Sequence, residues 1–504
     1  MATMTNALWR TMVVTHRYLG VAVGLLMVMW FASGIVMMYV GFPRVTEEMR
    51  TRTLAPISWQ ACCRFGERLP ADDETVLRAQ VENLAGGPVM RLQRPGRLDT
   101  SIDLAHGVAM RIDADQARAI VLDAAPRIIG PAATVVSTEQ AQTDQWTVGR
   151  LFRDRPLHRF EFDDPERTNI YVSGTAGQVV HWTTATQRFW NWLGTIPHFL
   201  YFADLRSNVA LWSQIVIWAS ILGAFLTVVG LYLGIAQFRR GSAGKLSPYR
   251  GIFYWHHLAG LVFGLVTLTW VFSGLVSMNP WGFLEGRRAG GEQGRVQGQA
   301  PKWSDVRASL DAIRARPALA DAVSLVTAPL AGQLYWLATL NDGTVVRLDA
   351  TGNVAAPTAS DLAQAAQRIA GTTGIAEQRL MDQEDAYYFK GRRDELVLPV
   401  YRITLSDADS TRYYLDPNTG ALLQRADANG RWRRWLFGGL HRIDFTAWMR
   451  ARPIRDIIVL TLMLGGLGVT VTGCYLAIRR IRSDLASLLR SLRRQPERVQ
   501  GIPS

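Results

Sequence analysis

The sequence predicts an α-helical membrane protein with four transmembrane helices arranged as an internal duplication, plus α+β domains outside the membrane. Three observations indicate this fold class. Four long apolar stretches alternate with long polar segments. One pattern of residues occurs twice, at a shift of about 240 positions. The polar segments contain short β-rich runs, turn signals and helical patterns, which are typical of α+β domains.

Each apolar stretch is long enough to cross a bilayer as a helix. The stretches cover residues 18–43, 209–238, 251–283 and 457–478, and each exceeds the ~20 residues that a transmembrane helix needs. The first stretch does not resemble a cleavable signal peptide, because its apolar core is too long and no small-residue cleavage site follows. The lipid bilayer is therefore an expected partner.

The formal net charge of +13 is concentrated beside the apolar stretches. Arg10 and Arg17 precede the first stretch, a short basic loop joins the second to the third, and an arginine-rich tail follows the fourth. Short basic loops stay in the cytoplasm. This rule predicts that both termini and the middle loop are cytoplasmic and that the polar segments lie across the membrane. Nucleic acid is not an expected partner, since the basic residues lie where membrane topology puts them.

The predicted organisation alternates membrane helices with polar modules. In chain order it comprises transmembrane helix 1 (10–43), polar module 1 (44–207, with an interfacial segment at 186–207), transmembrane helix 2 (208–238), a cytoplasmic loop (239–250), transmembrane helix 3 (251–284), polar module 2 (285–455, with an interfacial segment at 431–455), transmembrane helix 4 (456–479) and a basic cytoplasmic tail (480–504).

The duplication relates the helices and the polar modules alike. His16 falls on His256 at a shift of 240, and His198 falls on His441 at a shift of 243. Further matches are Ser33 with Ser273, Trp30 with Trp270, Arg159 with Arg402, Tyr171 with Tyr414, Gly223 with Gly466 and Gly230 with Gly473. Parallel repeats of this kind imply a pseudo-twofold axis along the membrane normal.

The second polar module carries the clearest local signals. Two β-rich runs, 398–405 and 411–415, precede a turn at 416–420 and a short returning strand, which together predict a hairpin. Helices are predicted at 304–313, with Ser304 as the N-cap, and at 360–369. A loop is predicted at 286–299, which is rich in glycine, glutamine and arginine.

Four of the eight histidines lie in the paired repeats of the apolar segments. An intramembrane histidine is a functional hypothesis by default. His16 and His256 are expected at the inner edge of the bilayer, and His198 and His441 at its outer edge. Two imidazoles at equal depth suit the bis-histidine axial ligation of a b-type haem. We expect two haem b groups, with these four histidines as the cofactor-binding residues and iron ligands.

Several of these residues also have structural interpretations. An interfacial histidine can be a polar group near lipid headgroups. Trp30 and Trp270 are expected to be packing or membrane-belt residues rather than electron relays. His257 competes with His256 as a ligand, although its repeat partner is Arg17. The glycines Gly20, Gly24, Gly260 and Gly264 can serve helix packing or leave room for a flat macrocycle.

Signatures of other chemistries are missing from the sequence. It contains no HExxH motif, no GxGxxG after a strand and no P-loop, so nucleotide binding is not supported. The adjacent Cys62 and Cys63 are predicted to be thiols rather than a vicinal disulfide, because no CxxC spacing is present. Without a CxxCH motif, covalently attached c-type haem is not expected.

The sequence resembles the PepSY-associated transmembrane-helix family of bacteria. The matching elements are the opening His16-Arg17-Tyr18-Leu19-Gly20, the later Ser33-Gly34, the Leu-Pro-Val-Tyr-Arg run at 398–402, the strand and turn at 413–420, and Leu440-His441 followed by Thr472-Gly473. The resemblance implies four transmembrane helices, periplasmic PepSY-type α+β modules and an inner-membrane location. Members that resemble ferric-siderophore reductases carry two b haems and reduce iron(III) chelates in the periplasm.

Three functional hypotheses follow. The first is an inner-membrane dihaem reductase that takes electrons from an unknown donor, a quinol or a cytoplasmic reductase, and reduces a periplasmic ferric siderophore or other iron(III) chelate. Reduction to iron(II) weakens a hard-oxygen chelate. The second is a quinol-linked cytochrome b that serves another periplasmic acceptor. The third is a non-enzymatic, membrane-anchored PepSY module that binds peptides or inhibits peptidases.

Overall fold

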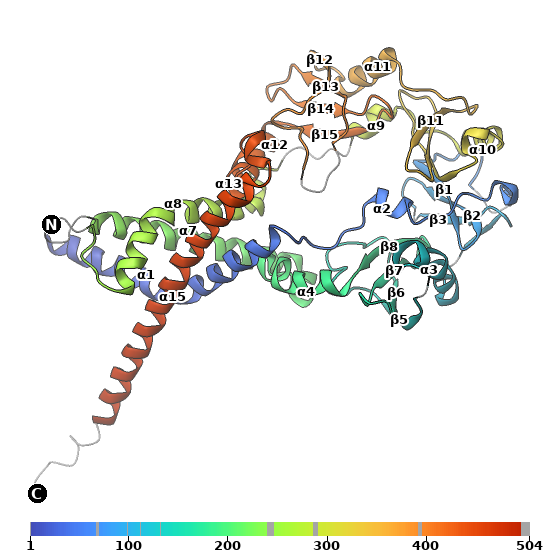
Figure 1. Cartoon of the computed structure of the whole chain (residues 1–504). Helices are drawn as coiled ribbons and strands as arrows, with labels where there is room; N and C mark the ends of the chain where they lie inside the picture. Colours follow the sequence, from blue (N-terminus) through green and yellow to red (C-terminus); the bar gives the residue numbers. More distant parts are fainter. Residues whose placement is uncertain are drawn as a thin grey trace, which may run out of the picture. The chain divides into compact units, whose positions relative to one another are not determined.

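Four long helices form the first of the two units into which the chain folds. They are α1 (Ala2–Met37), α7 (Val209–Gln237), α8 (Ile252–Ser277) and α15 (Ile454–Arg494) (Figure 1). Each is long and apolar enough to cross a membrane. The four predicted membrane helices are therefore confirmed, and the chain is a multi-pass membrane protein. α15 continues past the predicted end at 479, because alanine, leucine and arginine in its last turns favour helix.

A computed structural model describes residues 2–66, 70–97, 99–110, 112–131, 133–238, 246–285, 291–391 and 396–494. The membrane unit comprises Met1–Gly41, Trp190–Phe283 and Arg433–Ser504, and the sheet unit comprises Phe42–Phe189 and Leu284–Trp432. Most of the predicted basic loop (239–245) and the end of the predicted tail (495–504) lie outside the described residues.

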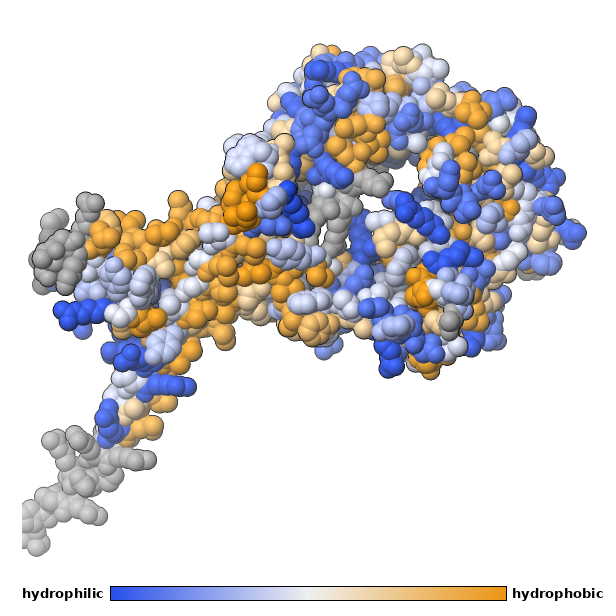
Figure 2. Space-filling view, in the orientation of Figure 1, coloured by the Kyte–Doolittle hydropathy of each residue, from blue (hydrophilic) through white to orange (hydrophobic). Residues whose placement is uncertain are grey.

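The membrane unit buries its helix contacts and exposes apolar side chains. Phe31, Trp270 and Met463 lie in its core. A Cβ atom at Gly466 would lie 2.6 Å from Cε1 of Phe31, so this glycine lets α1 and α15 approach closely. Apolar residues gather along the outside of the helices (Figure 2), as a lipid environment requires.

Short helices occupy the two predicted interfacial segments. In the first segment these are α4 (Ala185–Leu193), α5 (Thr195–Phe199) and α6 (Ala203–Ser207). In the second they are α12 (Ala428–Arg433), a π-helical turn (Arg434–Gly439), α13 (Leu440–Arg442) and α14 (Ala447–Arg450). His198 lies on α5 and His441 on α13.

The sheet unit contains three antiparallel sheets, which confirms its α+β character. The central sheet has seven strands in the order β11-β10-β9-β1-β2-β3-β4, and the two others have the orders β5-β6-β7-β8 and β12-β13-β14-β15. The central strands are β1 (Arg78–Leu84), β2 (Gly87–Gln93), β3 (Thr100–Asp103), β4 (Val108–Ala109), β9 (Ala322–Thr327), β10 (Tyr335–Leu340) and β11 (Val345–Asp349).

Each four-stranded sheet packs against a longer helix. The first consists of β5 (Val135–Ala141), β6 (Leu157–Phe162), β7 (Asn169–Ser173) and β8 (Val179–Thr183), with α3 (Ala114–Ile129). The second consists of β12 (Ile375–Met381), β13 (Val400–Leu405), β14 (Arg412–Leu415) and β15 (Leu422–Ala426), with α11 (Ala359–Ala370). β14 and β15 pair antiparallel, which confirms the predicted hairpin.

The central sheet joins the two segments that the sequence predicts as separate modules. β1 pairs with β9, with Val81 opposite Leu325 and Glu82 opposite Ser324. Both strands are buried along almost their whole length. Neither strand could therefore remain an exposed edge, and each satisfies its backbone groups by pairing with the other. We call this pairing the seam.

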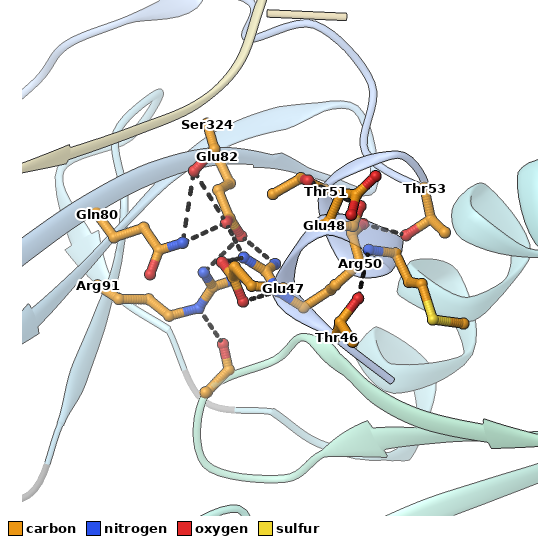
Figure 3. Close-up of polar contacts among 12 residues, drawn as sticks. Thr46, Glu47, Glu48, Arg50, Thr51, Thr53, Gln80, Glu82, Arg91 and Ser324 are labelled. Atoms are coloured by element: carbon orange, nitrogen blue, oxygen red, sulfur yellow. Dashed lines mark hydrogen bonds and ion pairs between the residues drawn. The ribbon is translucent and has the colours of Figure 1, made fainter. Parts of the chain in front are cut away.

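A buried ion cluster lies beside the seam (Figure 3). Glu82 on β1 is fully buried, and its carboxylate lies 2.5 Å from Nη2 of Arg50 and 2.6 Å from Nη1 of Arg91. Ser324 on β9 donates its hydroxyl to the same carboxylate at 3.3 Å. Burial alone would raise the pKa of Glu82, but Arg91 and Arg50 outweigh it and lower the pKa from 4.5 to about 2. Glu82 is therefore ionised inside the sheet unit.

Three local predictions are wrong. α10 (Trp303–Ile313) has Lys302 rather than Ser304 as its N-cap, because Asp305 accepts a hydrogen bond from the Lys302 N–H. In the predicted loop, residues 286–290 lie outside the described residues, whereas Glu292–Gln297 forms the helix α9. Cys62 and Cys63 form a vicinal disulfide instead of remaining thiols.

Candidate cofactor site

The two inner histidines face each other across the helix bundle. His16 comes from α1 and His256 from α8, and their ring centres lie 6.5 Å apart with an angle of 39° between the ring planes. The prediction that these two residues form a pair rests only on their matching positions in the repeat. The structure brings the same two side chains together, one from each half of the chain.

Backbone carbonyl groups fix the orientation of both inner rings. Nδ1 of His16 lies 3.2 Å from the Leu226 carbonyl oxygen, and Nδ1 of His256 lies 3.2 Å from that of Val469. A carbonyl oxygen only accepts hydrogen bonds, so each Nδ1 carries the proton. The lone pair then resides on Nε2, which makes no hydrogen bond to any residue that the structure describes. This tautomer is the one that binds a metal through Nε2.

Two glycines provide the space for these rings. A Cβ atom at Gly230 would lie 2.6 Å from Cε1 of His16, and one at Gly473 would lie 2.9 Å from Cε1 of His256. Any larger residue would displace an imidazole. The sequence shows these glycines as matched positions of the repeat but gives no sign of this role, because each lies more than 200 residues from its histidine.

Both inner histidines line a cavity of about 400 Å³. This volume lies within the usual range for cofactor and small-molecule sites. Gly20 and Gly260 line the cavity, and a Cβ atom at either position would meet no other atom within 4 Å. The walls are otherwise mainly apolar, so a flat, largely apolar group fits between the rings.

The outer histidines form a second facing pair. The ring centres of His198 and His441 lie 6.3 Å apart, with an interplanar angle of 73°. Nδ1 of His198 lies 3.1 Å from the Trp30 carbonyl oxygen and 3.2 Å from Oγ of Ser33. Nδ1 of His441 lies 3.0 Å from Oγ of Ser273. Nε2 of each outer ring again makes no hydrogen bond within the described residues.

The backbone of His441 has a side-chain partner. The indole N–H of Trp270 donates to the His441 carbonyl oxygen at 2.9 Å. Trp270 also packs edge-on against Phe31, with ring centres 5.7 Å apart. Trp270 thus packs in the bundle, as predicted, and also donates a specific hydrogen bond that the sequence does not reveal.

The spacing within each pair fits a shared metal. An imidazole nitrogen lies about 2.0–2.1 Å from a first-row transition metal and about 1.1 Å from its own ring centre, so two imidazoles on one metal have ring centres roughly 6.3 Å apart. The observed separations of 6.5 and 6.3 Å agree with this value. Both pairs therefore fit the bis-histidine ligation that a b-type haem requires.

The two pairs lie at different depths in the bundle. His256 begins the apolar part of α8, and Ser273, which holds His441, lies near its end. At a rise of about 1.5 Å per residue, this stretch of helix is roughly 25 Å long. The hydrocarbon core of a bilayer is about 30 Å thick. One pair thus suits each edge of a membrane.

His257 and the matched arginines have other partners. His257 is held at both ring nitrogens, by Oγ of Ser247 and by the Gly234 carbonyl oxygen, each at 2.8 Å. It therefore has no lone pair left for a metal. Arg159 pairs with Glu139, and Arg402 with Glu377 and Asp385, so both arginines form ion pairs in the sheet unit. No group of three or more histidine, cysteine or acidic side chains suited to a metal ion occurs among the described residues.

Comparison with known proteins identifies the family. A search of curated proteins found no match. A family model described as the PepSY-associated TM region matches residues 13–343, a span that includes the predicted ligands His16, His198 and His256. This match covers more than half of the 504 residues, and the resemblance noted in the sequence is confirmed. The chain belongs to the family of proteins with a PepSY-associated transmembrane region.

Proposed function

We propose that this protein is a membrane-spanning b-type dihaem reductase. His16 and His256 would hold one haem b, and His198 and His441 the second. The acceptor would be a ferric siderophore or another iron(III) chelate outside the cytoplasm. The protein would lie in a bacterial inner membrane, with both termini in the cytoplasm and the sheet unit in the periplasm.

The observation that carries this proposal is the geometry of the two histidine pairs. Each pair combines a ring separation near that of shared metal ligation with an Nδ1 atom engaged by a carbonyl or hydroxyl oxygen. The fifth histidine of the membrane unit behaves differently, since His257 uses both ring nitrogens in hydrogen bonds. Four imidazoles that lie in close pairs, each with Nδ1 engaged and without a hydrogen bond at Nε2 among the described residues, are best explained as ligands.

Internal duplication would explain why the histidines of each pair have matching hydrogen-bond partners. The Leu226 carbonyl serves His16 as the Val469 carbonyl serves His256, and these carbonyl groups are related by the same shift of 243 as His198 and His441. Ser33 and Ser273 likewise serve the two outer histidines. We infer that one ancestral half-site was used twice, so that each half supplies one ligand to each pair.

The chemistry fits transfer of single electrons. A bound b-type haem supplies one-electron transfer, at a potential that depends on its axial ligands and surroundings. The protein residues hold the imidazoles in one tautomer and raise their basicity through the Nδ1–H hydrogen bonds. One electron converts iron(III) in a chelate to iron(II), which hard oxygen ligands hold less tightly. The electron donor would be a membrane quinol or a cytoplasmic reductase, since the sequence has no nucleotide-binding signature.

Reoxidation of the purified protein tests this function. We expect the reduced protein in nanodiscs to show a b-type spectrum that returns to the oxidised form when a ferric siderophore is added. A redox-inert gallium siderophore of the same shape is the control and should leave the spectrum unchanged. Reoxidation by small acceptors but not by any ferric chelate would favour a cytochrome b with another acceptor. A protein without haem would favour the non-enzymatic PepSY module.

Substitution of the glycine that contacts the His256 ring tests the inner pair. Gly473→Ala places a methyl group 2.9 Å from Cε1 of His256, so the ring must shift away from the Val469 carbonyl. Loss of such a supporting contact typically lowers metal-site affinity about 10–100-fold, and we expect this loss for haem at the inner pair in a haem titration. Gly468→Ala on the same helix is the matched control, because its Cβ meets nothing within 4 Å. Equal haem affinities of the two variants would contradict the proposed role of His256.

A further inference from the structure

The inner cavity carries positive charge without a counter-charge in its walls. Arg17 and Arg480 line the cavity, and its described lining contains no aspartate or glutamate. Charged groups at the edge of a membrane are expensive unless they are paired or reach water. Two arginines that line an apolar chamber therefore offer charged donors to an anionic ligand.

The position of each arginine on its helix directs it to the same chamber as the histidines. On α15, Gly473, Ala477 and Arg480 all line the cavity, at the spacing i, i+4, i+7 that places residues on one helix face. Arg480 thus lies two helical turns, about 10 Å, beyond Gly473, the glycine that contacts the His256 ring. On α1, Val13, Arg17, Gly20 and Gly24 line the cavity at the spacing i, i+4, i+7, i+11, which also places them on one helix face.

One nearby carboxylate neutralises only part of this charge. Asp484 lies 2.9 Å from Nε of Arg480 and accepts a hydrogen bond from the Tyr18 hydroxyl at 2.7 Å. Arg17 makes no ion pair with any residue that the structure describes. Arg480 therefore still has guanidinium N–H groups to offer, and Arg17 has all of its own.

We propose that Arg17 and Arg480 bind the two carboxylate groups of the macrocycle that spans His16 and His256. This inference rests on the proposed function. Arginine suits the role because its planar guanidinium group can donate two parallel hydrogen bonds to one carboxylate. The pair of arginines fixes the orientation of the ligand, with its carboxylates towards the Arg480 end of the cavity and its apolar edge towards Met27 and Thr267 at the other.

Neutralising the ligand carboxylates tests this proposal. The full chain carrying His441→Ala, so that only the inner pair can bind, is stripped of haem and placed in zwitterionic lipid nanodiscs. It is titrated with ferric haem b and with the dimethyl ester of haem b, and binding is followed by the Soret absorbance. A hydrogen bond to a charged group contributes about 1.5–3 kcal/mol. We therefore expect the ester to bind at least about tenfold more weakly than haem.

Arginine variants complete the test. Arg17→Gln and Arg480→Gln should each weaken haem binding about tenfold and reduce the preference for haem over its ester. Arg479→Gln is the matched control, because Arg479 precedes Arg480 but does not line the cavity. Equal binding of haem and ester to the parent protein would overturn the proposal while leaving the proposed function intact. Loss of ester binding together with haem binding in Arg480→Gln would assign that arginine a structural role and overturn the proposal as well. Failure of the parent to bind either compound would instead refute the proposed function.

Discussion

Replacing His441 with alanine is expected to halve the haem content of the purified protein, from two groups per chain to one. The variant loses one of the two Nε2 donors of the outer pair and leaves His198 alone opposite an alanine. A bis-histidine haem depends on both axial ligands for its low-spin spectrum. Haem per chain, measured by pyridine haemochrome absorbance against protein mass, reads the result directly. His16→Ala should remove the inner haem and leave the outer one.

His257→Ala is the control for these variants. His257 lies next to His256 and lines the same cavity, yet both of its ring nitrogens already have hydrogen-bond partners. We expect this variant to keep two haem groups with unchanged low-spin spectra. Retention of two haems by His441→Ala, or loss of one in His257→Ala, would contradict the ligand assignment. Double replacement of His16 and His441 should give a colourless protein.

Replacing Glu82 with glutamine is expected to destabilise the sheet unit by about 3–5 kcal/mol, because removing one partner of a buried ion pair leaves an uncompensated charge. Arg50 retains Glu47 as a partner, but Arg91 loses the only carboxylate paired with it in the described part of the chain. Hydrogen–deuterium exchange of the full chain in nanodiscs measures the effect, and amides of β1, β2 and β9 should exchange at least about a hundredfold faster.

A surface pair offers the matched control for Glu82. Asp123 and Arg127 on α3 form an ion pair at 2.7 Å, with each side chain 32% exposed. Such pairs contribute about 0–1 kcal/mol, so Asp123→Asn should leave the exchange rates of the central sheet unchanged. Similar exchange rates in Glu82→Gln and Asp123→Asn would show that the buried cluster does not stabilise the seam.

The stability of the sheet unit at acid pH should depend on the same ion cluster. The folded pKa of Glu82, about 2, lies below its ordinary value of 4.5. A depressed carboxyl pKa stabilises the fold fully above the ordinary value, and this stabilisation is lost as pH falls towards the folded value. The difference in stability between the parent protein and Glu82→Gln should therefore be constant above about pH 5 and shrink between about pH 4.5 and 2.

The membrane helices and the histidine pairing follow from the sequence for a clear reason. A membrane helix is specified by length and apolar composition alone, and these are local properties. The pairing of His16 with His256 follows from repeat symmetry, since matched positions in parallel repeats lie at matched depths. Their role as ligands remains a prediction, and so does the internal duplication.

The contacts that orient the histidine rings cannot be predicted from the sequence, because they are made by backbone groups or depend on glycines. The Leu226 and Val469 carbonyls carry no signal in residue identity, and Gly230 acts through the absence of a Cβ atom. The bond from Trp270 to the His441 carbonyl likewise involves a backbone group and cannot be inferred from residue identity. Such features become visible only when distant segments are placed together.

The pairing of strands in the central sheet cannot be predicted from the sequence for a topological reason. Local propensity identifies strands but not their partners, and β1 pairs with a strand about 245 residues away in the sequence. By contrast, the hairpin of β14 and β15 is encoded within one short stretch and is predicted correctly. Distance along the chain thus separates the predictable parts of this fold from the others.

The seam also sets an order of events during biosynthesis. β1 is made long before β9, and α7 and α8 must enter the membrane in the interval. Throughout that time the growing chain presents β1 as an open hydrogen-bonding edge, which is a template for aggregation. We therefore expect this strand to need shielding until β9 arrives, and a polypeptide truncated before residue 322 should aggregate more readily than the full chain.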